Sequence, residues 1–541
     1  MSASGLHGVQ LVLLLLLLFV VVFSTLAKRL QTPYPIVLVI AGLLVAFIPG
    51  IPKVSLDPDM VFLVVLPPLL YSAAWVTSWR DFSYNLTSIA SLAIGLVAFT
   101  VFGVAAAVSW VFSGMDWHTG VVLGAVVATT DAIAATSIAK RIGLPKRIVD
   151  ILEGESLLND ATGLLALEFA TAMVVYGQNP TVFSAAGRLA YLIAAGIAIG
   201  LVIARIVEWF EHRIDDGPIE IAVSLFVPYA TYLAAEALHA SGVLAVVAAG
   251  LYLSRRSSRF FSPSVRLQAY SVWGSLTFIL NGLVFVLIGL QLPYVLAGIR
   301  EVPLTKLLLY GLLFSALLIV LRLVWSFPGA YVAYYFRKHV LHQREDPPSL
   351  RNVFVIGWTG MRGVIALAAA ISLPQTIADG SPFPHRDLIV FLTFAVILVT
   401  LVVQGLTLPP LIRSLGLAAP TGPDCEEQEA RRLMIEAAIA YLNNRDRANE
   451  PPESTDLYDD IHKHYTHRLA NISHQDGQPH DTARELYDRY LALSQELLDT
   501  ERNTAVRLRD EGRINDEVLR QLEHELDLSE TRLAATTPDS A

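Results

Sequence analysis

The run from Glu155 to Asp160 places four polar side chains in a stretch that is otherwise apolar. At about 100° per residue of an α-helix, Glu155 and Asn159 stack one turn apart, and Ser156 and Asp160 form a second stacked pair beside them. Hydroxyl and carboxylate oxygens are the ligands that a hard cation prefers. Because an ionised carboxylate in a bilayer costs about 2.5–3.5 kcal/mol, this run needs partners, water or a transported ion. It indicates a cation and proton site.

The composition requires a membrane protein. Of the 541 residues, 54% are hydrophobic and 16% are charged, and the mean hydropathy is +0.53, which is too apolar for a soluble chain of this length. Residues 421–541 hold 14 Lys and Arg against 27 Asp and Glu, whereas residues 1–420 hold 25 against 21. We therefore predict a transmembrane domain over 1–420 and an acidic, soluble, helical tail over 421–541. The single cysteine, Cys425, excludes a disulfide framework.

About thirteen apolar segments have the length of a bilayer span, and the predicted fold is an all-α membrane protein. Lys and Arg gather in the loops on the side of the tail, which predicts a cytoplasmic tail and an outside N-terminus. The segments are 8–27, 34–51, 58–76, 86–112, 119–140, 150–177, 183–210, 217–237, 241–254, 266–292, 304–336, 352–373 and 386–412.

Two of these segments contain residues that interrupt a helix. The fifth holds Thr129-Thr130-Asp131, and the twelfth has three glycines around Arg362. They lie seven segments apart, as expected for inverted repeats of segments 1–6 and 8–13. Broken helices at matching positions of two halves are a good sequence indicator of an ion site near the middle of the membrane.

Five motifs occur in a fixed order. They are Leu66-Pro67-Pro68-Leu69-Leu70, Thr130-Asp131, the Glu155 to Asp160 run, His239-x-Ser241-Gly242-Val243-Leu244-Ala245 and Gly360-x-Arg362-Gly363. Over about residues 8–415 the chain thereby resembles the NhaP-type sodium/proton antiporters of the monovalent cation/proton antiporter superfamily, relatives of the animal sodium/hydrogen exchangers. It departs from their pattern at Ala132, where many relatives have proline, and at Ser72, where some have an acid.

The resemblance implies thirteen helices, with the fifth and twelfth crossed and partly unwound, in a protein that is usually a homodimer. It assigns ion and proton binding to Asp160, with Asp131, Ser156 and Thr130 lining the sodium site. It also implies a structural ion pair between Glu155 and Arg362, steadied by Asn159. Sodium ions and protons are then substrates, and we expect no cofactor.

The residues themselves favour the same ion pair. Arg362 is the only cation deep in the second interrupted segment, and a buried cation needs a compensating charge, for which Glu155 is available. Arg322 is expected near the cytoplasmic end of an overlong helix, with its head group reaching the water. Two alternatives stay open, because Asp131 can also cap a helix half and Asp160 can be a permanently neutral acid.

The leading hypothesis is an antiporter that exchanges sodium or lithium for protons across the cell membrane, for pH and sodium homeostasis. The chain lacks a glycine-rich loop for ATP, and we expect neither an enzyme nor a nucleic-acid binder. Asn159 stands where the electrogenic branch of the superfamily has a further aspartate, so we predict electroneutral 1:1 exchange.

Potassium/proton exchange is the first alternative, and a cation channel the second. An intramembrane enzyme is disfavoured because Ser156, His239 and Asp160 lack a nucleophile elbow. The tail is expected to be regulatory, with an undetermined partner.

Overall fold

A computed structural model describes residues 3–48, 56–111, 115–177, 181–214, 216–299, 302–343, 347–418, 425–444, 454–472, 482–513 and 516–534. The chain divides into two compact units, Met1–Ala419 and Pro420–Ala541. Within the described residues the structure is helical, apart from one isolated bridge between Thr376 and Pro382.

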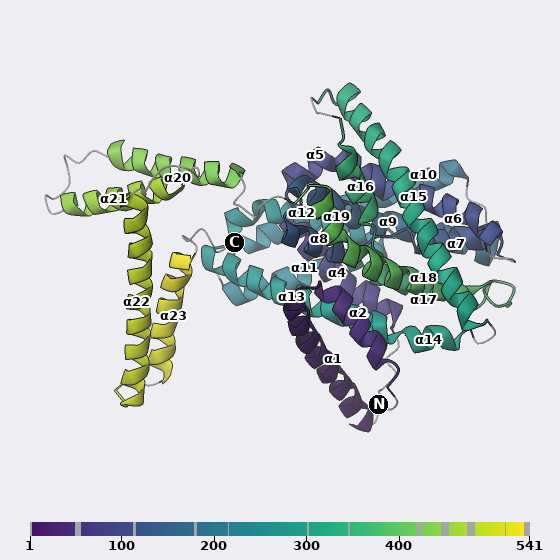
Figure 1. Ribbon diagram of the computed structural model, residues 1–541, viewed down its shortest axis with the longest axis horizontal. Coiled ribbons are helices and arrows are strands. Elements are labelled where there is room, and N and C mark those ends of the chain that lie inside the picture. The colour runs from purple at the N-terminus through teal and green to yellow at the C-terminus, as the bar shows by residue number, and fades with distance from the viewer. Residues whose placement is uncertain are drawn as a thin grey trace. The chain divides into compact units, whose positions relative to one another are not determined.

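The first unit is a bundle of helices, several of which carry short π-helical turns (Figure 1). Nine of the described helical stretches are long and apolar enough to cross a membrane. Each of the thirteen predicted segments overlaps at least one helix, and the number of crossings stays a prediction. In chain order the elements are α1 (Ala3–Arg29), α2 (Tyr34–Val45), α3 (Pro58–Met60), η1 (Val61–Val65), α4 (Leu66–Val76), α5 (Trp79–Ala90), η2 (Ser91–Leu96), α6 (Val97–Val111), α7 (Trp117–Val126), α8 (Ala132–Ile142), α9 (Lys146–Tyr176), α10 (Val182–Glu211), α11 (Gly217–Ala237), α12 (Gly242–Phe260), α13 (Pro263–Leu290), α14 (Leu292–Ala297), α15 (Leu304–His339), α16 (Leu350–Trp358), α17 (Val364–Ile371), α18 (Arg386–Val399), η3 (Thr400–Gln404) and α19 (Gly405–Ser414).

The two predicted interruptions are confirmed. Helix α7 ends at Val126 and α8 begins at Ala132, while α16 ends at Trp358 and α17 begins at Val364. In the first break Asp131 is the N-cap of α8, a position where a short acidic side chain is favoured over helix continuation. The second break carries glycines, which lower the helical propensity of the chain. Local chemistry therefore ends both helices inside the bundle.

The double proline has a milder effect than the two breaks. Pro67 and Pro68 lie in the first turn of α4, directly after the π-helical turn η1. Because Pro58–Val76 is one continuous helical stretch, these prolines lie inside it, and the π-helical turn is where the helix accommodates their missing N–H donors. This segment stays helical through Val76.

Packing of the first unit places α9 against both halves of the first broken segment. Helix α9 contacts α7 and α8, α17 contacts α7, and α13 packs along α2. The polar run of α9 therefore faces the break between α7 and α8, and helices α2 and α13 supply another wall nearby.

The second unit contains four described helices, α20 (Cys425–Asn444), α21 (Ser454–Ile472), α22 (Thr482–Asp510) and α23 (Asp516–Ala534). Helices α22 and α23 pack against each other, and Leu491, Ala505 and Leu519 are buried in this unit. Arg502 of α22 bridges Asp527 at 2.6 Å and Glu530 at 2.8 Å on α23. Its described helices combine these buried apolar residues with charged residues on exposed faces, the pattern of amphipathic helices.

Candidate cation and proton site

Asp131 lies where two helix halves begin. Its carboxylate accepts a hydrogen bond from Ile133 N at 2.8 Å, as the N-cap of α8, and its own N–H donates to Met361 O in the second break at 2.9 Å. Gly363, the N-cap of α17, touches the same side chain, because a Cβ there would lie 2.6 Å from Asp131 Oδ2. Helix N-termini carry partial positive charge. Asp131 is therefore a cap that also presents its carboxylate to both half-helices.

Arg362 lies where the other two helix halves end. Its Nε donates to Val127 O, after α7, at 2.8 Å, and its guanidinium donates to Gly360 O, after α16, at 2.5 Å. Its backbone N–H donates to Thr400 Oγ1 at 3.2 Å. Carbonyls at a helix C-terminus lack helical partners and carry partial negative charge. Backbone oxygens, rather than a carboxylate, thus receive this buried cation, and the predicted Glu155–Arg362 ion pair is wrong.

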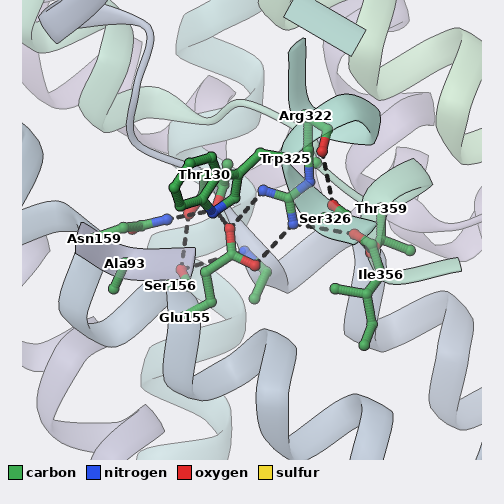
Figure 2. Close-up of polar contacts among 12 residues, drawn as sticks. Ala93, Thr130, Glu155, Ser156, Asn159, Arg322, Trp325, Ser326, Ile356 and Thr359 are labelled. Carbon is green, nitrogen blue, oxygen red and sulfur yellow. Dashed lines mark hydrogen bonds and ion pairs between the residues drawn. The ribbon is translucent and has the colours of Figure 1, made fainter. Parts of the chain in front are cut away.

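The partner of Glu155 is Arg322 of α15 (Figure 2). The two side chains form a bidentate pair with N–O distances of 2.5 and 2.8 Å, and each is 2% exposed. Arg322 also donates to Ile356 O at 3.2 Å. The prediction that Arg322 reaches the cytoplasmic water is wrong, because α15 places it deep in the bundle. Gly360 allows this position, since a Cβ on Gly360 would overlap the Arg322 side chain.

A hydrogen-bond network joins the polar face of α9 to the first break (Figure 2). Asn159 Nδ2 donates to Thr130 Oγ1 at 2.5 Å, and that hydroxyl donates to Glu155 Oε1 at 3.0 Å. Ser156 Oγ donates to Thr130 O at 2.9 Å and accepts from Ala132 N at 3.3 Å. The amide of Asn159 thus orients Thr130 and, through it, Glu155, whereas Ser156 fixes the unwound backbone.

The four predicted sodium-site residues, Thr130, Asp131, Ser156 and Asp160, line one cavity of about 550 Å³. Asp160 is 3% exposed, and its Oδ1 has no hydrogen-bond partner among the described residues. The lining therefore includes the carboxyl groups of Asp131 and Asp160 and the hydroxyl group of Ser156, oxygen ligands that suit a small hard cation.

The other wall of the cavity was not predicted from the sequence. Tyr34 of α2 and Asn281 of α13 line it. Asn281 is 4% exposed, and its Oδ1 has no hydrogen-bond partner in the described part of the chain. A lone asparagine inside segment 266–292 is a sequence signal that could have identified this wall, since buried polar groups in a membrane helix tend to be functional.

The sequence model described as "Sodium/hydrogen exchanger, transmembrane" matches residues 14–414. The chain belongs to this sodium/hydrogen exchanger family. It is 34% identical over 538 residues to an uncharacterised sodium/proton exchanger of Mycobacterium tuberculosis, covering 98% of this chain and 97% of the relative. A sodium/proton antiporter of Aphanothece halophytica is 32% identical, with 76% of each chain covered. A relative in Bacillus pumilus, named as a sodium, potassium, lithium and rubidium/proton antiporter, is 33% identical, with 82% of this chain and 67% of the relative covered.

A solved antiporter has the same fold as this exchanger. The sodium/proton antiporter MjNhaP1 from Methanocaldococcus jannaschii superimposes with a TM-score of 0.60 at 20% sequence identity, over 78% of this chain and all of the other. The predicted all-helical antiporter fold is thereby confirmed. The resemblance stated from the motifs is confirmed with it.

Proposed function

We propose that this exchanger moves sodium ions and protons in opposite directions across the cell membrane. The environment of Asp160 is the main support for this proposal. Asp160 is a buried carboxylate that lines the cavity, and one of its oxygens has no hydrogen-bond partner in the described residues. Such a group must be ionised to hold a cation, and protonation neutralises it, so cation and proton compete for one site. Exchange follows from this competition without a further energy source.

We infer that the conformation described here is open to the cytoplasm. The cavity reaches the surface beside Lys140 and Glu153, which line it and form an ion pair at 2.8 Å. Lys140 lies in one of the basic loop regions, and basic loops face the cytoplasm in membrane proteins. The N-terminus is then outside and the tail inside. We also infer a homodimer, as the resemblance implies.

The proposal includes electroneutral 1:1 exchange. Glu155 is held by Arg322 in a bidentate pair, so it is not available as a carrier. Asp131 caps α8 and adjoins α17, where the helix N-termini favour a constant negative charge. Asp160 is then the single group that alternates between a proton and a cation.

The Asp160→Asn variant tests the central role of Asp160. Asparagine keeps the volume and removes the ionisable group, so we expect sodium-driven proton movement in proteoliposomes to fall to the level of empty vesicles. The purified variant should keep a monodisperse elution profile. Asp59→Asn, at an exposed acid at the start of α3, is the matched control and should retain exchange. Exchange by the Asp160 variant above a few per cent of wild type would contradict the proposal.

Potassium is the second candidate substrate, and the name of the Bacillus pumilus relative is the observation that favours it. The size and rigidity of the oxygen set decide between the two ions. Running the same vesicle assay with sodium, lithium and potassium separates the two proposals. We expect dissipation of the pH gradient by sodium and lithium at concentrations where potassium has no effect.

A further inference from the structure

A second cavity, of about 370 Å³, lies among α5, η2, the start of α9, the second half of α15 and α16. Among the described residues, its charged lining consists of Arg147 and Arg337, with no carboxylate. Ser88 and Ser349 supply hydroxyl groups, and Asn352 supplies an amide. None of these residues lines the cation cavity, so the exchange mechanism leaves this cavity without a role.

The two arginines differ in depth. Arg337 is buried, at 4% exposure, whereas Arg147 is exposed and donates from Nε to Asn85 Oδ1 at 3.2 Å. Guanidinium groups carry several N–H donors in a fixed plane, which matches the oxygens of a phosphate or carboxylate. The cavity thus offers a donor-rich wall that extends from the surface into the bundle.

The size and the location of the cavity restrict the class of ligand that it can bind. The volume lies in the usual range for small-molecule sites, roughly 300–1,000 Å³. Arg147 follows Lys140, Arg141 and Lys146 in one of the basic loop regions, which under the orientation inferred above faces the cytoplasm. Basic pockets between membrane helices on that side suit anionic lipid head groups. We propose that this cavity binds a phosphate-bearing anion, either the head group of an anionic phospholipid or free phosphate.

An anion bound in this cavity would lie beside residues that contact the Glu155–Arg322 pair. Ser326 and Ile356 line the cavity; Ser326 Oγ donates to Arg322 O at 2.7 Å, and Ile356 O accepts from the Arg322 guanidinium. An anion held between Arg147 on α9 and Arg337 on α15 connects these two helices at the cytoplasmic end of the pair. Because a ligand that binds only the folded protein stabilises it, binding should raise the melting temperature.

The test measures the melting temperature of the purified full chain in a neutral detergent. Phosphatidylglycerol is compared with phosphatidylcholine, and inorganic phosphate with chloride at equal ionic strength. We expect phosphatidylglycerol to raise the melting temperature by several degrees over phosphatidylcholine. A rise with inorganic phosphate that equals the lipid effect would assign the site to free phosphate, and a rise with the lipid alone would assign it to a head group.

Arginine variants show whether binding in this cavity causes the shift in melting temperature. Arg147→Gln and Arg337→Gln should each lose at least half of the shift, whereas Arg259→Gln, at an exposed arginine outside the cavity near the end of α12, should keep it. Arg147 is exposed, so its variant decides the question even if the Arg337 variant fails to fold. Two results would overturn the proposal: no shift with either phosphate-bearing probe, or an Arg147→Gln shift equal to that of the Arg259 control.

Discussion

The Glu155–Arg322 pair yields a double-mutant prediction that distinguishes Arg322 from Arg362. Both members of the pair are 2% exposed and share two short charge-assisted hydrogen bonds. In Arg322→Met, the Glu155 carboxylate loses both guanidinium hydrogen bonds and keeps the one from the Thr130 hydroxyl. Removing one partner of a buried pair destabilises a protein by roughly 3–5 kcal/mol, because the other charge stays buried without compensation. We expect a loss of that size for Arg322→Met.

The second substitution should reverse much of the loss. Glu155→Gln removes the uncompensated charge, and its amide still offers an oxygen to the Thr130 hydroxyl. We therefore expect the Glu155→Gln/Arg322→Met double variant to be at least about 2 kcal/mol more stable than Arg322→Met, since neutral replacement of a whole buried pair is often tolerated. Arg362→Met should also destabilise, because Val127 O and Gly360 O lose their donor, but Glu155→Gln should recover little of that loss.

The assay is equilibrium unfolding of the purified variants in mixed micelles with increasing dodecyl sulfate, followed by tryptophan fluorescence. The coupling energy of each pair comes from the four proteins of its cycle. A coupling energy between Glu155 and Arg362 that equals or exceeds the one between Glu155 and Arg322 would refute the assignment of the ion pair.

Three further predictions concern the site, the tail and the stoichiometry. Gly363→Ala should reduce both exchange and melting temperature, because its Cβ would lie 2.6 Å from Asp131 Oδ2, whereas Gly187→Ala has open space and should change neither; a normal Gly363 variant would contradict the contact. A chain ending at Ala419 should keep exchange and change its pH dependence, since the first unit is compact by itself; a folded but inactive truncate would show that the tail takes part in exchange. In vesicles clamped with potassium and valinomycin, provided potassium is not transported, the end point of sodium exchange should be independent of voltage, because an uncompensated charge would add about 2.3 kcal/mol per 100 mV; a shifted end point means more than one proton per cation.

The sequence by itself determined the class of protein and singled out four residues that the structure brings to one cavity. Polar residues inside an apolar helix are costly, so the Glu155 to Asp160 run stands out without any structural knowledge. Helix periodicity alone places Ser156 and Asp160 on one face. The breaks at Asp131 and Gly363 could be predicted because capping and glycine act through the local backbone.

Only the tertiary structure decided which charges meet. Glu155 pairs with Arg322, 167 positions along the chain, because α15 brings that arginine to α9 at a depth that no local pattern encodes. Arg362 is satisfied by Val127 O and Gly360 O, and backbone carbonyls have no signature in the sequence. The wall containing Asn281 depends in the same way on how α13 packs along α2. Local preferences fix the helices and their interruptions, whereas the register between distant helices fixes the partners of their charges.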